Sequence, residues 1–185
     1  NEGAKLTIKF APESTRTATG GGGNVGTQYA NDQKKQKEWT PANFSLKIDG
    51  LTCSSANKID AITVKQAVVT HNVGERREAQ KEPASLEIPN LVVTLAETDA
   101  KEWYDWHKSF LIDGKNSDGD EKGGTLEYRT KDMETVLFTI KFDHLGIFKL
   151  TPEKVEAASG NIRRVKAEMY CENMVFDFPG SSTWA

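Results

Sequence analysis

Cysteine and histidine are both scarce in this sequence, with two and three residues respectively among 185. Cys53 and Cys171 are too few and too far apart for a disulfide framework or a zinc site, so we expect two free thiols, with Cys171 in a strand. Free thiols fit a reducing compartment. No apolar run approaches the roughly 20 residues of a membrane-spanning helix, and residues 1–10 lack the pattern of a secretory signal. These absences predict a soluble chain with no membrane contact.

An excess of positive charge is also lacking, because 24 Lys and Arg residues face 27 Asp and Glu residues, for a formal net charge of −3. The densest basic runs are residues 34–37 and 163–166, and the remaining basic residues are scattered. A nucleic-acid-binding domain usually gathers a positive excess on one face. We therefore interpret both runs as solvated surface and expect no specific nucleic-acid binding.

Recognisable catalytic motifs are missing as well. The sequence has no G-x-S-x-G elbow and no H-E-x-x-H pair, and the glycine run at 20–23 is not followed by the Lys-Ser/Thr of a phosphate-binding loop. His71 begins a charged stretch, His107 lies among aromatic residues, and His144 stands in an expected turn. Packing or turn roles are favoured for these histidines. We therefore expect no catalytic residue, no cofactor and no metal site.

One acidic loop resembles a calcium site in spacing. Counting from Asn116, Asp118 and Asp120 take the third and fifth positions of an EF-hand loop, and Glu127 takes the twelfth. However, Glu121 occupies the sixth position, where the sharp turn needs Gly, and Glu127 falls in an expected strand. The favoured interpretation is a solvated loop.

The sequence divides into three regions. Residues 1–42 combine an alternating stretch at 5–10, which predicts a strand, with a Gly-rich segment that we expect to be a flexible arm, because consecutive glycines carry a high entropic cost inside a regular element. Residues 43–178 carry regular β patterning and form the expected barrel domain. Residues 179–185 are a short C-terminal tail.

Alternation of polar and apolar residues predicts a mainly β, antiparallel barrel or sandwich. Phe44–Ile48 alternates and stops at the turn pair Asp49–Gly50. A longer strand is expected over Ile59–Thr70, with Ile62, Val64 and either Ala67 or Val69 pointing inward. Further strands are expected at 86–88, 91–95, 125–128, 135–142, 147–150 and 163–178.

Irregularities in this pattern also carry predictions. The charged, apolar-poor stretch 72–83 predicts a projecting loop. Pro89 lacks the N–H that a central strand needs, so it marks a break or an edge. Asn173 breaks the alternation of the last strand, which predicts a bulge or register change there.

A single helix is expected after residue 98. Thr98 or Asp99 can cap it, with Glu102 completing a capping box, and Gly114 stands where a left-handed residue ends many helices. An aromatic stripe at helical spacing lies between these signals, formed by Trp103, Tyr104, Trp106, His107, Phe110 and Leu111. We expect this flanking helix to cover an open side or end of the β structure.

The order of these elements resembles the tail-tube family of contractile phages, which also includes the inner tubes of extracellular contractile injection systems. The features that carry the resemblance lie within about residues 43–178: the strands 44–48 and 91–95, the helix with Trp103 and Trp106, the Gly-started strand 124–128, and the long closing strand. The Cys53–Asn57 segment departs from the Gly- and Ser-rich segment usual there, and the extension 1–42 is not standard in short tube subunits.

The resemblance implies a non-enzymatic structural subunit. It would assemble into stacked hexameric rings that form a hollow tube, with the sheath and baseplate proteins of the same machine as partners. The particle would be a virion tail or injection system assembled in the bacterial cytoplasm. Candidate interface residues are those of the charged loop and the helix: Asn72, Glu75, Arg76, Arg77, Glu78, Trp103 and Trp106.

Other functions stay open at this point. A tube-end protein or a monomeric adaptor would use the same fold, and an enzyme on an unfamiliar β scaffold has no motif to support it. A small-ligand or carbohydrate-binding domain would use the tryptophans as a stacking platform. The ligand-binding hypothesis predicts that Trp103 and Trp106 are exposed beside polar groups, whereas the tube hypothesis predicts that they are packed.

Overall fold

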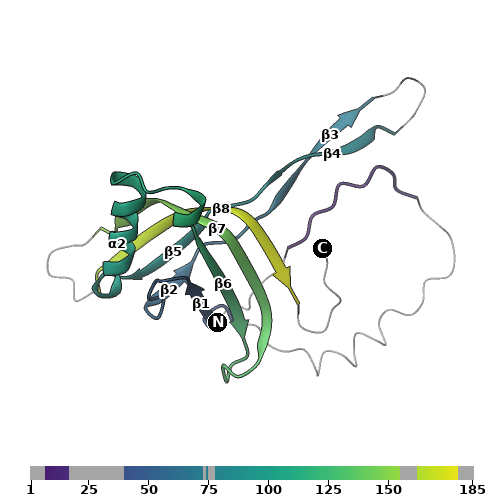
Figure 1. Ribbon diagram of the computed structural model, residues 1–185. Coiled ribbons are helices and arrows are strands. Elements are labelled where there is room, and N and C mark those ends of the chain that lie inside the picture. The colour runs from purple at the N-terminus through teal and green to yellow at the C-terminus, as the bar shows by residue number, and fades with distance from the viewer. Residues whose placement is uncertain (1–6, 17–39, 73, 75–77, 155–161, 179–185) are drawn as a thin grey trace.

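The computed structural model describes residues 7–16, 40–72, 74, 78–154 and 162–178. The described part of the chain is mainly β, with 51% of the described residues in strands. Six strands form one antiparallel sheet in the order β1-β6-β7-β8-β5-β2, which curls into a nearly closed barrel (Figure 1). The strands are β1 (Phe44–Ile48), β2 (Ala56–Ile59), β5 (Leu91–Ala96), β6 (Lys122–Arg129), β7 (Val136–Pro152) and β8 (Arg164–Asp177). The expected fold class, an antiparallel β-barrel with a flanking helix, is confirmed.

The core fills the barrel interior because alternate side chains of each strand point inward. On β5 and β8 the cross-strand pairs Leu91–Met169, Val93–Ala167 and Leu95–Val165 are all fully buried. Such directly opposed pairs are the unit that stabilises an antiparallel sheet. The register is fixed by this pattern, since a slip of one residue would turn every one of these side chains to the outside.

One helical segment of the described chain covers the barrel (Figure 1). It begins with a 3-10 turn, η2 (Glu97–Asp99), continues as α2 (Lys101–His107), and ends in a π-helical turn, η3 (Lys108–Ile112). Gly114 has a φ of 69°, the expected left-handed residue past the helix end. The expected capping box is wrong: no side chain caps α2, and the Glu102 carboxylate instead accepts a hydrogen bond from the backbone N–H of Thr52. No described helix has the length and apolarity to span a membrane.

A two-stranded hairpin projects from the barrel (Figure 1). Its strands are β3 (Lys65–His71) and β4 (Gln80–Glu87), which pair only with each other within the described chain. The expected long strand Ile59–Thr70 is therefore wrong as a single unit, because the chain leaves the barrel at Asp60 and starts β3 at Lys65. Ile62 packs against the core as expected, but Val64, Ala67 and Val69 are exposed. Within the expected loop 72–83, residues 80–83 are the start of β4, and residues 73 and 75–77 lie outside the described residues.

Two further expectations need correction. Residues 7–10 form no strand and are exposed; residues 5 and 6, like 17–39 of the expected arm, lie outside the described residues. The N-terminal segment contacts β4 instead, where the backbone N–H of Lys81 donates to the Glu13 carboxylate at 2.9 Å and its ammonium donates to the Pro12 carbonyl at 2.7 Å.

His144 does not lie in a turn between two strands, because β7 runs through it without interruption. The pairing of β7 with β6 shifts between Lys122–Leu145 and Gly124–Phe142, so Asp143 and His144 together oppose the single residue Gly123. This is a β-bulge. The alternation of β8 does change near Asn173, but β7 and β8 stay in register through that point, with Asp143 opposite Asn173. The predicted bulge or register change of β8 at Asn173 is therefore wrong, because the bulge at this level lies on β7, opposite β6.

Candidate functional site

The hairpin of β3 and β4 is the first candidate contact surface. Every residue of β3 is exposed, and so are all residues of β4 except the half-buried Lys81. Three of the exposed residues are large and apolar: Val68, Val69 and Leu86. Asn72 and Glu78 flank the tip and are exposed, whereas the predicted interface residues 75–77 lie outside the described chain. An exposed ribbon with apolar side chains is a surface that gains stability when another chain covers it.

The helix presents its tryptophans to the inside of the molecule. Trp103 is 0% exposed and Trp106 is 8% exposed. The indole N–H of Trp103 donates to the Thr52 carbonyl oxygen at 3.0 Å, and the Trp106 ring meets Phe110 edge-on at 6.1 Å. This burial contradicts the stacking-platform hypothesis, which needed exposed indoles. The two tryptophans pack within the chain, and their place in a subunit interface stays a prediction.

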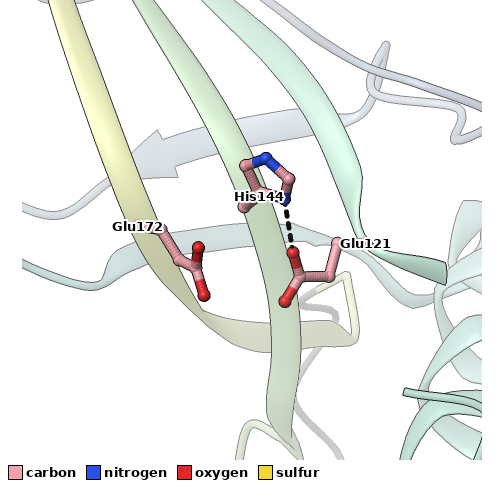
Figure 2. A group of neighbouring side chains, drawn as sticks. All are labelled: Glu121, His144 and Glu172. Carbon is pink, nitrogen blue, oxygen red and sulfur yellow. Dashed lines mark hydrogen bonds and ion pairs between the residues drawn. The ribbon is translucent and has the colours of Figure 1, made fainter. Parts of the chain in front are cut away.

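A cluster of ionisable side chains lies on the barrel where three neighbouring strands meet. Glu121 immediately precedes β6, His144 is the bulge residue of β7, and Glu172 stands opposite His144 on β8. One nitrogen or oxygen atom from each residue lies within 4.8 Å of the others. Figure 2 shows the three side chains converging from these elements.

The bulge explains why the cluster forms. His144 has a φ of 55°, a left-handed conformation that His tolerates better than most residues other than Gly and Asn. A bulge of this kind turns a side chain away from its regular alternation. Beside it, the Asn173 side-chain N–H donates to the Asp143 carboxylate at 3.0 Å and ties the two strands together at the same level.

Glu121 is the most constrained member of the cluster. Its side chain is only 7% exposed, against 49% for His144. One carboxylate oxygen lies 2.7 Å from Nδ1 of His144, and the other accepts a hydrogen bond from the Tyr170 hydroxyl at 2.5 Å. A carboxylate held from both sides has a fixed orientation, in contrast to Glu172, whose carboxylate has no hydrogen bond or ion pair with any described residue.

The charge environment shifts two pKa values in the cluster. The hydrogen bond to Glu121 raises the pKa of His144, because it favours the protonated imidazole, and the negative charges of Glu121, Glu172 and Asp118 act in the same direction. Burial raises the pKa of Tyr170 to about 12, and the hydrogen bond to Glu121 adds to this effect. The site thus favours positive charge and disfavours any further negative charge.

A surface depression of about 350 Å³ adjoins the cluster. Its lining includes Glu121 and His144, and its other members are Asp118, Lys122, Gly123, Asp143 and Asn173. Lys122 is the one lysine of that lining, and its ammonium sits 5.4 Å from the Trp106 ring centroid. No ion pair joins Lys122 to a carboxylate of the described chain. Three carboxylates line the depression, those of Asp118, Glu121 and Asp143, so negative charge predominates there.

Sequence reasoning missed this cluster. Glu121, His144 and Glu172 are more than 20 residues apart from one another, and only the pairing of β6, β7 and β8 brings them together. In the sequence, Glu121 stands out only as a residue that does not fit position six of an EF-hand loop. Glu127 is, as expected, in a strand, where it binds Arg129. Both cysteines are free, as predicted, and Cys171 lies in β8.

Comparison with known proteins identifies the fold. No protein-family model matches the sequence, and no curated protein sequence matches it. A chain in the cryo-EM structure of the anti-feeding prophage tube-terminating cap is similar with a TM-score of 0.66 at 12% identity, over 77% of this chain and 93% of that one. A chain of the PVC sheath–tube complex, an extracellular contractile injection system in its extended state, is similar with a TM-score of 0.63 at 14% identity, over 84% and 99%.

A third similar structure is a chain of the six-fold symmetrised anti-feeding prophage baseplate, with a TM-score of 0.62 at 10% identity, over 75% of this chain and 93% of that one. These likenesses establish that this chain has the tail-tube type of fold found in the tube and cap structures of contractile injection systems. The resemblance drawn from the order of elements is confirmed at the level of the fold.

Proposed function

We propose that this chain is a non-enzymatic structural subunit of the hollow inner tube of a contractile phage tail or related injection system, assembled as stacked hexameric rings. The observation that carries the proposal is the match to a chain of a sheath–tube complex, which covers 84% of this chain and 99% of the other. Its partners are further copies of itself and the sheath and baseplate proteins of the same particle. Assembly of that particle takes place in the bacterial cytoplasm.

The open edges of the barrel support ring formation. Within the described chain β1 pairs only with β6, and β2 pairs only with β5, so each has one strand edge without a partner. Unpaired edges expose backbone N–H and C=O groups that can pair with another chain, and closure into a ring uses them without leaving a free edge. The joined strands of six subunits line the channel in this proposal.

The hairpin supports stacking. β3 and β4 extend beyond the barrel and expose Val68, Val69 and Leu86 together with the charged tip that Asn72 and Glu78 flank. In the assembled tube the hairpin contacts the neighbouring ring, where its apolar residues become covered. Asn72, Glu78 and residues 75–77 belong to this proposed contact.

The test measures assembly directly by light scattering after size-exclusion chromatography, with negative-stain images of the same fractions. The native chain is expected to give six-fold rings and stacks of rings. Leu86→Glu, on the hairpin, is expected to give rings with few stacks, because a charge is placed in the proposed ring-to-ring contact. Ile112→Glu is the matched control, since Ile112 is also a large exposed apolar residue, at the helix end and outside the hairpin. A native chain that stays monomeric at high concentration contradicts the proposal.

A tube-end role is the second candidate, and the similarity to a tube-terminating cap structure favours it. A tube-end subunit forms rings that dock on a tube but do not stack on one another. The same images separate the two roles, because single rings that never stack, even in the native chain, indicate a tube end. Strict monomers would favour an adaptor.

A further inference from the structure

We propose that Glu121, His144 and Glu172 bind one divalent transition-metal ion, of which Zn²⁺ is the representative. The site is independent of the proposed assembly role. It would join the start of β6 to β7 and β8 on the barrel wall.

The ligand atoms are already close to a coordination geometry. Nδ1 of His144 and the nearer Glu121 oxygen are 2.7 Å apart, close to the roughly 3 Å that separates two atoms each bound about 2 Å from the same zinc ion. All three donors lie within 4.8 Å. The Glu172 side chain can move the remaining distance toward the ion, because its exposed carboxylate has no hydrogen bond or ion pair with a described residue to break. Water completes the coordination of such a three-ligand site.

The chemistry of the donors selects the class of ion. An imidazole nitrogen with two carboxylates suits Zn²⁺ and its neighbours in the first transition row, whereas Ca²⁺ and Mg²⁺ take oxygen ligands. The depression around the cluster also holds Asp118 and Asp143. Lys122 lies against Trp106 and makes no ion pair with these carboxylates, so a bound cation would relieve the repulsion among the carboxylates of Glu121, Glu172 and their neighbours.

The surroundings resemble the support that metal ligands need. The buried Glu121 carboxylate is oriented by the Tyr170 hydroxyl on its second oxygen, which is the outer-shell hydrogen bond that holds a ligating carboxylate in place. Tyr170 itself is fixed between the Phe110 ring, 6.4 Å away, and the backbone of Gly146. The bulge at His144 gives further support, since it directs the imidazole toward the carboxylates of Glu121 and Glu172.

The test uses the full chain, freed of metal with a chelator, and titrates it with ZnCl₂ by calorimetry, with CaCl₂ and MgCl₂ in parallel. One equivalent of Zn²⁺ is expected to bind and to raise the melting temperature, while Ca²⁺ and Mg²⁺ bind at least tenfold more weakly. Co²⁺ is the spectroscopic probe, because its visible absorption reports whether nitrogen and oxygen ligands surround it.

Three variants assign the binding to this cluster. His144→Asn keeps a residue that tolerates positive φ and removes the imidazole, and Glu172→Gln preserves shape while removing charge; each is expected to weaken Zn²⁺ binding at least tenfold. Tyr170→Phe removes only the outer hydrogen bond and is expected to weaken it roughly tenfold to a hundredfold. His71→Ala is the matched control, since His71 also lies beside a glutamate, 3.5 Å from Glu82, but in the hairpin and outside the cluster.

Loss of Zn²⁺ binding in the first two variants with native affinity in His71→Ala supports the site. The proposal is overturned if the native chain binds no Zn²⁺, or if folded His144→Asn and Glu172→Gln, checked by circular dichroism, bind it as tightly as the native chain. Thiolate absorption in the Co²⁺ spectrum would also overturn it, because it would place the ion on a cysteine. None of these outcomes depends on whether the chain forms rings.

Discussion

The indole N–H of Trp103 donates a 3.0 Å hydrogen bond to the carbonyl oxygen of Thr52, and through it the covering helix is attached to the segment between β1 and β2. Each group depends on this hydrogen bond, because the indole is fully buried and Thr52 lies outside the strands. The helix is thus part of the barrel domain, not an appendage. Glu102 strengthens the same junction through the Thr52 N–H.

Replacing the buried donor should therefore destabilise the domain. Trp103→Phe leaves the Thr52 carbonyl without its hydrogen-bond donor and creates a cavity. We therefore expect the free energy of unfolding to fall by about 1–3 kcal/mol, as measured by urea denaturation. Trp106→Phe is the comparison, because the Trp106 N–H has no hydrogen-bond acceptor among the described residues. Equal losses in the two variants would argue against the Thr52 contact.

A side chain at Gly146 should destabilise the domain for a steric reason. A Cβ at this position would collide with the ring of Tyr170 on the neighbouring strand, and Tyr170 cannot move freely because it is packed beside Phe110. We expect Gly146→Ala to cost about 1–3 kcal/mol and to lower the melting temperature. Gly119→Ala should change stability by less than about 0.5 kcal/mol, since no atom lies within 4 Å of the added carbon. A silent Gly146→Ala would contradict the described position of Tyr170.

Asp60 should give the domain a pH-dependent contribution. The hydrogen bond from Lys58 holds the pKa of Asp60 below its ordinary value of 3.8, burial opposes this shift, and Lys166 also lowers the pKa. The two ammonium groups lie 2.9 Å and 3.3 Å from its carboxylate. Because the folded-state pKa is lowered, the stabilisation is fully present above the unfolded-state pKa and is lost as the pH falls through the folded-state pKa.

Asp60→Asn should accordingly reduce the free energy of unfolding by about 0.2–1 kcal/mol at pH 7, a small value because the groups are partly exposed. The difference between the two proteins should shrink in acid and with added salt. Denaturation curves at neutral and acidic pH measure it, with Glu134→Gln as a control, because Glu134 makes no ion pair within the described chain. A difference that grows in acid would have the wrong sign.

The two thiols should react slowly with aromatic disulfide reagents. Burial raises the pKa of both Cys53 and Cys171, so the reactive thiolate is scarce near neutrality. Cys171 is buried in β8 and Cys53 is half-buried, so Cys171 should be the slower of the two. In denaturant both should react at once, giving two equivalents per chain. Fast labelling of Cys171 in the folded protein would mean that β8 opens readily.

Much of the fold was readable from local sequence. The strand Phe44–Ile48 ends where its alternation ends, at a glycine with positive φ. The break at Pro89 separates β4 from β5, and the aromatic stripe ends before Gly114. Each of these depends on a short-range cause: side-chain alternation, a missing N–H or a left-handed turn.

The errors occurred where a distant partner overrides a local pattern. Ile59–Thr70 reads as one strand, yet its first part pairs with β5 and its second part with β4, so the chain must leave the barrel between them. Residues 7–10 alternate like a strand but have no partner strand in the described chain. His144 resembles a turn residue, yet pairing with β8 carries β7 straight through it.

The sequence by itself determined the β architecture and the buried aromatic helix, because alternation and helical spacing are local records of which side of an element is buried, and the order of these elements resembles the tail-tube family. Tertiary structure alone decided that Trp103 meets Thr52, that a hairpin leaves the barrel at Asp60, and that Glu121, His144 and Glu172 share one site. Those relationships depend on strand register and on a single bulge, and the register between strands far apart in sequence is set by the packing of the whole barrel.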